Sequence, residues 1–218
     1  MAFSAFERMV ALRYLRPRRQ EGFVSIIAAF SVLGITIGVA ALIIVMAVMN
    51  GFRQELLKQI LGANGHLTVF SSSLQIDSYD DLSRRLSGVE GVTLVTPQIQ
   101  GQVVVTVGKS AAGALVRGMT LADIEDRPLL AGNIVAGGLD AFAAGEGVLI
   151  GSRLAAKYGL RAGDSITLVS PTGNTTVMGT VPRLKTYPIA GLFEMGFSVY
   201  DESFIYMPLE AAQIFFRL

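Results

Sequence analysis

The chain has 218 residues, of which 51% are hydrophobic and only 16% are charged, with a formal net charge of +1 and no cysteine. Soluble domains usually have about a quarter charged residues, so this composition indicates a membrane segment. The lack of cysteine excludes a disulfide framework and a thiolate metal site. Residues 53–218 contain 13 Lys and Arg against 15 Asp and Glu, and this acidic balance argues against a nucleic-acid partner.

Residues 1–21 form a basic N-terminal segment. Its arginines are Arg8, Arg13, Arg16, Arg18 and Arg19. Apolar side chains at positions 3, 6, 9, 10 and 14 fall near one side of a helix, which predicts an amphipathic segment lying along the cytoplasmic membrane surface. An ordinary charged flank would also fit. Basic flanks stay in the cytoplasm, so we expect a cytoplasmic N-terminus and an extracytoplasmic domain after the span.

Residues 22–52 carry no charge and are bracketed by Glu21 and Arg53. About 20 apolar helical residues cross a bilayer core, so this segment predicts one transmembrane helix. A buried helix of a soluble protein and a cleaved signal peptide are the alternatives. The apolar core is about twice the usual length of a signal peptide, and the residues after it continue a helical pattern.

One side of the predicted span carries small residues in its first part and bulky residues toward its outer end. The small residues are Ser31, Gly34, Gly38 and Ala41, and the bulky ones are Val45, Met49 and Phe52. Small residues let helices approach closely in lipid, so the first group predicts a helix interface. The bulky end could border a cleft near the outer surface. Membrane helices often contain glycine, so a helix without a specific partner is the alternative.

Residues 53–218 predict an α+β domain, because short strands alternate with short helices. The span continues as helix through 53–61 and is stopped by the glycines at 62 and 65. Strands are predicted at 66–70, 92–96, 102–107, 114–117, 147–150, 165–170, 186–193 and 203–207. Helices are predicted at 79–86 and 152–158, a poor helix broken by Pro128 is predicted at 123–130, and a last helix opens at Pro208. The stretch at 132–147 predicts turns, and the acids at 123–126 predict a solvated helix face.

The segment at about 171–185 predicts an irregular loop that is long for a compact domain. No acid occurs between Asp164 and Glu194, and the charges in between are Arg183 and Lys185. A basic loop containing proline and glycine is a candidate for binding an acidic partner. A solvated hairpin is the alternative.

No catalytic motif is present in the sequence. The phosphate-binding pattern GxxxxGK[ST] is absent, so we do not expect this chain to be an ATPase. His66 is the only histidine, and zinc prefers histidine and cysteine ligands, so we expect no metal site. We therefore predict a non-enzymatic protein with no cofactor of its own.

Several stretches resemble the LolC/LolE family, the membrane subunits of the lipoprotein-releasing ABC transporter, which are related to the MacB and FtsX permeases. The resemblance rests on ALRYLRPRR, MNGFRQELLKQILG, GVLIGSRLAAKYGLRAGDSITLVSP, MGTVPRLKTYPIAGLFEMGFSVYD and FIYMPLEAAQ. It covers essentially the whole chain. It implies a transmembrane helix followed by a MacB-like periplasmic α+β domain, incomplete at the C-terminus because family members have three further spans.

The resemblance also implies a function and a set of partners. Two such subunits in the inner membrane would sit on ATPase subunits (LolD-like) that bind ATP and Mg. They would take lipoproteins from the bilayer into a cleft between first spans and pass them to the periplasmic carrier LolA. A hook-like loop holding LolA maps onto Val181, Pro182, Arg183, Leu184 and Lys185, and the lipoprotein cleft maps onto the bulky end of the span.

Three points remain open at the level of sequence. The hook and the FEMG stretch mix LolC-type and LolE-type features, so the chain resembles both. A MacB-like or FtsX-like permease that transmits mechanical motion to another substrate is an alternative of the same class. A single-span anchored binding or sensor module is the alternative of a different class.

We predict that a cysteine at Ser4 is protected from a membrane-impermeant thiol reagent in intact cells, while a cysteine at Ser78 is labelled. The reason is that the arginine flank should keep the N-terminus in the cytoplasm. The measurement is the labelled fraction of each variant, with cell lysis as the control that exposes both sites. Labelling of the Ser4→Cys variant in intact cells would contradict the orientation.

Overall fold

The computed structural model describes residues 4–15, 22–71, 75–176 and 179–218. The chain divides into two units, Met1–Ile60 and Leu61–Leu218, which are described separately. Phe3, Arg16, Arg18 and Arg19, which belong to the predicted N-terminal segment, lie outside the described residues.

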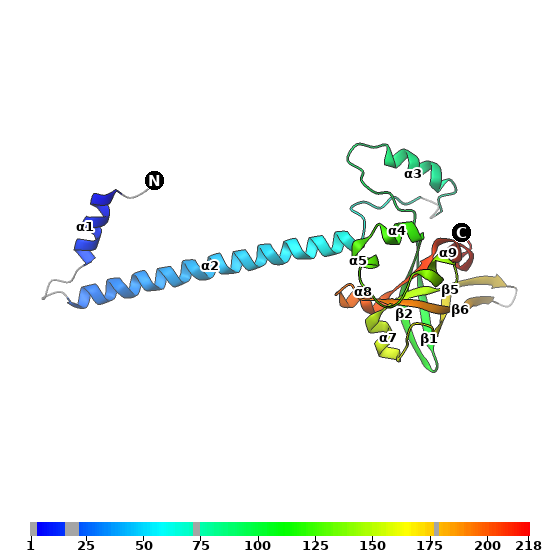
Figure 1. The fold of residues 1–218 in the computed structure, drawn as a ribbon. Coiled ribbons are helices and arrows are strands. Elements are labelled where there is room, and N and C mark those ends of the chain that lie inside the picture. The colour runs from blue at the N-terminus through cyan, green and yellow to red at the C-terminus, as the bar shows by residue number, and fades with distance from the viewer. Residues whose placement is uncertain (1–3, 16–21, 72–74, 177–178) are drawn as a thin grey trace. The chain divides into compact units, whose positions relative to one another are not determined.

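The first unit is helical. Helix α1 spans Ala5–Leu15, and the long helix α2 spans Gly22–Ala63 (Figure 1). On α1, Phe6 and Met9 are exposed, but Arg13 falls between them on the helical wheel. The predicted apolar side of α1 is therefore interrupted by a charged residue.

Helix α2 is long enough to cross a bilayer and continue beyond it. Its stretch Ile26–Leu57 is strongly apolar and has no contacts that bury it. At 1.5 Å per residue, its 42 residues extend about 63 Å, roughly twice a bilayer core. Thr36 donates its hydroxyl to the Val32 carbonyl at 2.7 Å, which satisfies a polar group that lipid could not. The predicted span and its helical continuation past Arg53 are confirmed as helix.

The second unit is an α+β domain, as predicted. Its helices are α3 (Tyr79–Ser87), α4 (Leu121–Glu125), α5 (Pro128–Ala131), α6 (Asp140–Ala143), α7 (Ser152–Tyr158), α8 (Ser198–Ser203) and α9 (Leu209–Phe216). Its strands are β1 (Ile99–Val107), β2 (Ser110–Met119), β3 (Ile134–Gly137), β4 (Val148–Gly151), β5 (Ser165–Thr176), β6 (Gly179–Phe193) and β7 (Phe204–Pro208).

The strands form one mixed sheet in the order β3-β6-β4-β7-β2-β1-β5. Strand β6 also pairs with β5, at the far end of that order. Its last residues pair with β3 and β4, and its earlier residues pair with β5 through Ser165↔Pro188 and beyond. The sheet therefore curls back on itself through this one long strand.

Two clusters of buried apolar side chains hold the domain together. The larger one joins β1, β2, β4, β5, β6 and β7 to Leu154 of α7 and Phe215 of α9. The smaller one joins Tyr206 and Phe193 to the short helices α4, α5 and α6. The rings of Phe193 and Tyr206 meet edge to face at 5.2 Å, a favourable aromatic geometry.

Local signals set several boundaries correctly. Helix α7 ends at Gly159, whose φ of 67° is left-handed, the conformation glycine adopts at low cost. Pro128 begins α5, so the helix predicted at 123–130 is divided into two short ones at the proline that was expected to break it. Thr120 and Asp123 form a capping box at the start of α4, and Asp123 is buried. The prediction of a solvated acidic face was therefore wrong at Asp123.

Other predicted elements differ from the structure. Residues 66–70 and 92–96 are not strands. The stretch predicted as turns contains β3 and α6, and α8 was not predicted. The irregular loop at 171–185 is instead made largely of paired strand, because β5 and β6 continue to Thr176↔Gly179. At β3 and along 171–185, strand pairing, which is non-local, overrode a glycine-rich or proline-bearing local pattern.

We predict that Gly151→Ala destabilises the domain by about 1–3 kcal/mol through overpacking. A Cβ at Gly151 would overlap the carbonyl oxygen of Asp201, and the φ of −66° at Gly151 suits alanine, so the contact alone is costly. Gly113→Ala is the matched control, because a Cβ there meets nothing within 4 Å. Thermal melting followed by circular dichroism measures both, and equal melting temperatures would contradict the prediction.

Candidate functional site

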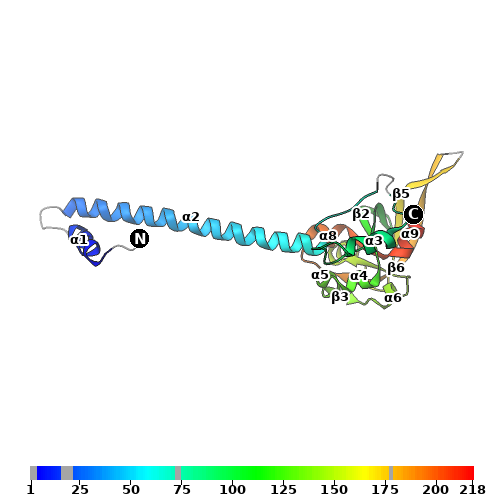
Figure 2. The same cartoon turned by 90° about the horizontal axis from the view of Figure 1, so that it is seen from above.

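The candidate site is the paired outer part of β5 and β6, here called the arm, residues 170–183. Strand β5 pairs with β1 only at Thr167, Leu168 and Val169. Past Val169, β6 is the only strand paired with β5 among the described residues. In Figures 1 and 2 this two-stranded ribbon extends past the rest of the sheet. The sequence-predicted hook residues 181–185 therefore run from this ribbon into its base.

The base of the arm is irregular. The β5–β6 register is continuous through Ser170↔Arg183 and resumes at Asn174↔Val181. Four steps on β5 thus match two steps on β6, so β5 carries extra residues around Pro171. Extra residues of this kind interrupt ladder hydrogen bonds and bend the strand. The direction of the arm therefore does not follow from sheet pairing alone.

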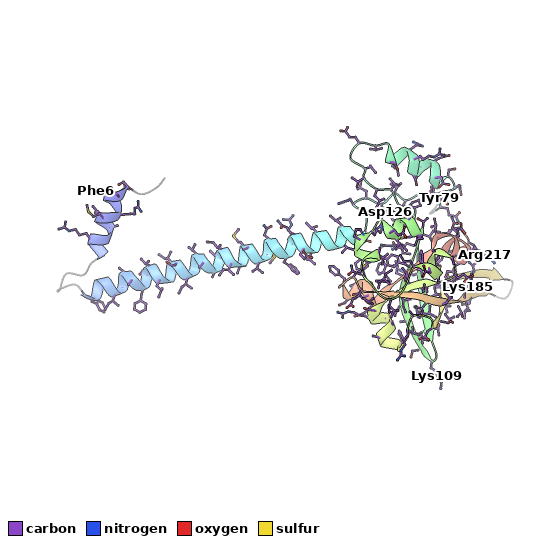
Figure 3. The ribbon with its side chains drawn as sticks, viewed as in Figure 1. Phe6, Tyr79, Lys109, Asp126, Lys185 and Arg217 are labelled. Atoms are coloured by element: carbon purple, nitrogen blue, oxygen red, sulfur yellow. The ribbon has the colours of Figure 1, made fainter. Side chains whose placement is uncertain are left out.

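Arg183 and Lys185 lie near the base of the arm, on its return strand. The Arg183 guanidinium donates to the main-chain carbonyl of Phe215 in the last turn of α9. The Lys185 ammonium lies 4.9 Å from the centroid of the Tyr187 ring. Figure 3 labels Lys185 on β6 and Arg217 just after α9, near the place where these elements meet. The two charges therefore contact the domain itself, and Lys185 is also exposed.

The opposite face of the arm's base is apolar. Antiparallel pairing places Val104, Val169 and Leu184 in one row across β1, β5 and β6. Leu184 is 63% exposed and Val104 is 38% exposed, and the neighbouring Pro182 is also exposed. Val181 pairs with Asn174 further along the arm. The hook residues predicted from the sequence thus divide between two faces, one basic and anchored, one apolar and open.

Tyr187 joins the arm's base to the core. Its ring meets Phe215 edge to face at 6.2 Å, and its side chain is 3% exposed. Burial raises the pKa of the Tyr187 hydroxyl to about 12, so the phenol is neutral across the physiological range. The ring is therefore a fixed apolar platform beneath Lys185.

A polar cluster that the sequence did not reveal lies where α2 ends. Arg117 donates to the Asn64 side-chain oxygen at 2.9 Å, and Asn64 in turn donates to the Tyr200 hydroxyl. The Arg117 guanidinium also lies 5.1 Å from the centre of the Phe204 ring and is 4% exposed. An arginine inside the apolar strand GALVRGM was the one sequence signal for it.

Burial controls ionisation around this cluster. Burial lowers the pKa of Arg127, with nearby Arg117 acting in the same direction. Burial raises the pKa of Tyr206, although Arg117 and Arg127 oppose that shift. The cluster thus combines two cations with a neutral phenol, and it holds the residues just after α2 against the sheet.

The predicted helix interface and cleft residues all lie on α2 and are exposed. Ser31, Gly34, Gly38 and Ala41 share one side of α2 with Val45, Met49 and Phe52, within a sector of about 80°. The three bulky side chains are 60–62% exposed. A Cβ at Gly34 or Gly38 would meet nothing within 4 Å, so the described chain leaves this side of the helix open.

The described residues contain no catalytic or metal-binding arrangement. They include no group of three or more His, Cys, Asp or Glu that could hold a metal ion. A hollow of about 400 Å³ lies beside the start of α3, and Asp77 is the one titratable residue among its described lining residues.

Comparisons with known proteins agree with the resemblance that the sequence indicated. A family model described as the MacB-like periplasmic core domain matches residues 28–218. The lipoprotein-releasing system transmembrane protein LolC of Xylella fastidiosa (strain Temecula1) is 30% identical over 217 residues, 99% of this chain and 52% of that protein. The LolC of Neisseria meningitidis is 30% identical over 215 residues, 98% of this chain and 52% of that protein. The LolE of Haemophilus influenzae is 28% identical over 211 residues, 94% of this chain and 50% of that protein.

The chain spans about half the length of these curated relatives. Among solved structures, the extracellular domain of the transporter YknZ from Gram-positive bacteria has a TM-score of 0.41 and 16% identity, covering 64% of this chain and 66% of that one. The periplasmic region of MacB from Actinobacillus actinomycetemcomitans has a TM-score of 0.41 and 12% identity, covering 68% and 59%. The resemblance to the LolC/LolE family is confirmed, and the chain is similar to proteins named LolC and to one named LolE.

We predict that Gly34→Leu combined with Gly38→Leu abolishes association with a second membrane subunit while insertion persists. Both sites are open among the residues that the structure describes, so the added side chains would clash with a neighbouring molecule packed there. The control is Ile35→Leu combined with Ile37→Leu on other sides of α2. Pull-down of a tagged partner subunit from detergent measures association, and equal recovery of both double variants would show that this side is not an interface.

Proposed function

The chain belongs to the MacB-like periplasmic core domain family, and from this membership we propose that it is the N-terminal part of an ABC transporter membrane subunit. The subunit extracts lipoproteins from the inner membrane and hands them to a periplasmic carrier of the LolA type. Relatives at about 30% identity over nearly the whole chain are named as lipoprotein-releasing transmembrane proteins, which supports the substrate class.

The observation that carries the proposal is the projecting arm. A two-stranded ribbon outside the sheet contributes little to the core, so its length needs a reason other than stability. The open face at the base of the arm presents Leu184, which is 63% exposed, beside Pro182. Exposed apolar side chains on a protruding element suit a contact with another protein. A soluble carrier that docks from the periplasm would meet such an element first.

The proposal divides the work among several components. A LolD-like ATPase subunit binds ATP and Mg, and this chain has no catalytic role. Helix α2 pairs with a second LolC/LolE-type subunit through its small residues. Lipoproteins enter from the bilayer beside Val45, Met49 and Phe52, whose exposure on α2 leaves them free to contact acyl chains. The N-terminus is cytoplasmic and the α+β domain is periplasmic.

We predict that replacing residues 171–182 by Asn-Gly, which favours a tight hairpin turn between the paired Ser170 and Arg183, lowers carrier capture at least tenfold. The shortened ribbon would lack the projecting contact, and tenfold corresponds to about 1.4 kcal/mol of binding free energy. The measurement is the amount of purified carrier that the full-length subunit captures. For this measurement the subunit is assembled with its ATPase and partner subunit in nanodiscs. Assembly and ATP hydrolysis should remain, because the arm lies outside the core.

Matched point variants refine this test. Leu184→Ser should lower capture, whereas Val135→Ser, at a 55% exposed position on β3, should not. If the shortened arm still captures carrier at the wild-type level, the arm is not the carrier site. Assembly and ATP hydrolysis with no carrier capture even by the wild type would instead favour a MacB-like or FtsX-like permease for another substrate.

A further inference from the structure

Arg183 stands at the point where the arm leaves the sheet. It is the last residue of β6 in continuous register with β5, opposite Ser170. Beyond that pair, β5 carries its extra residues and the ribbon has lost its β1 neighbour. A lone two-stranded ribbon next to a bulge bends and twists easily. A contact at Arg183 therefore acts where the direction of the arm is decided.

The partner of Arg183 is a fixed point of the domain. The guanidinium donates to the carbonyl of Phe215 in the last turn of α9. Carbonyls in the last turn of a helix have no partner within the helix, and a cation there is favoured by the helix dipole. The Phe215 ring is 1% exposed and packs in the larger core cluster. The same residue thus anchors α9 in the core and accepts the arm's hydrogen bond.

The pairing pattern places Arg183 and Leu184 on opposite faces of the ribbon. Arg183 shares its face with Ser170, which is buried, while Leu184 shares the other face with Val169. When the Arg183 face is held against α9, the Leu184 face is turned outward. One contact therefore fixes both the angle of the arm and the surface that it presents.

We propose that Arg183 is a positioning residue, which sets the direction of the arm by binding its base to the C-terminal end of α9. The inference rests on the proposed function, in which the arm holds a soluble carrier. It assigns Arg183 a different role from a charge that attracts an acidic partner. An arm held in one direction binds with less loss of conformational freedom, so fixing it raises affinity without any direct contact.

The orientation is measured without the carrier. Spin labels are attached to cysteines at Thr175 on the arm and Lys157 on α7, in the full-length chain freed of other cysteines and assembled in nanodiscs. Pulsed electron resonance gives the distance distribution between them. We expect one narrow distribution in the parent protein and a broadened or shifted one in Arg183→Met, which keeps an unbranched apolar side chain but cannot donate a hydrogen bond. Arg183→Lys should restore much of the narrow distribution.

Carrier capture is measured on the same variants at low and high salt. Arg183→Met should lower capture about tenfold, and the factor should be the same at both salt concentrations. The reason is that salt screens a charge that faces the partner but not a contact inside the domain. Arg183→Lys should recover most of the loss. Lys185→Met is the control, since it removes a neighbouring cation that does not contact α9 in the contacts described, and it should leave the distance distribution unchanged.

The outcomes separate this inference from the proposed function. An unchanged distance distribution in Arg183→Met overturns the positioning role, whatever happens to capture. A broadened distribution with unchanged capture also overturns it, because direction would then not matter for binding. A loss of capture that disappears at high salt would return Arg183 to a charge attracting the carrier. Capture by the shortened arm would refute the proposed function while the distance measurement still decides the Arg183 contact.

Discussion

The pairing of strand β6 is the constraint on which the rest of the domain depends. One strand joins β3 and β4 through its last residues and β5 through its earlier ones. The sheet curls because a single long strand must satisfy neighbours from both ends of the strand order. The same length takes β6 past the sheet, where its continued pairing with β5 makes the arm. The core and the candidate site are thus two parts of one hydrogen-bonded ladder.

A second constraint acts where the long helix gives way to the domain. The turn after α2 brings Asn64 to Arg117 and Tyr200, and a Cβ at Gly62 would overlap the Leu129 side chain. A buried arginine is tolerated only when its charge is compensated, and here a ring face and an amide oxygen contribute to that. Breaking this cluster would leave a buried cation, so it favours one position for Asn64 beside Arg117.

The sequence predicted those parts of the molecule that local chemistry determines. A charge-free run made α2 helical, and Gly159 ended α7 at the predicted residue. It failed where distant pairing decides, as at β3 within a glycine-rich stretch. The candidate site shows both what local chemistry predicts and what it misses. The sequence singled out residues 181–185, but whether Arg183 met solvent or α9 depended on Phe215, which lies 32 residues later in the chain, and no local pattern carries that information.

The two faces of the arm's base follow from strand geometry and have different physical uses. Successive side chains of β6 alternate, so a cation held by α9 at Arg183 obliges Leu184 to point the other way. The Arg183 charge is used inside the domain and is no longer available for steering a partner. Lys185 is exposed, so its charge is still available. An apolar contact at Leu184 would then contribute buried area to an interface, and the anchored Arg183 would fix the direction of the arm. Since Phe215 is set by the core, the arm inherits its orientation from the packing of the whole domain and not from its own short ribbon.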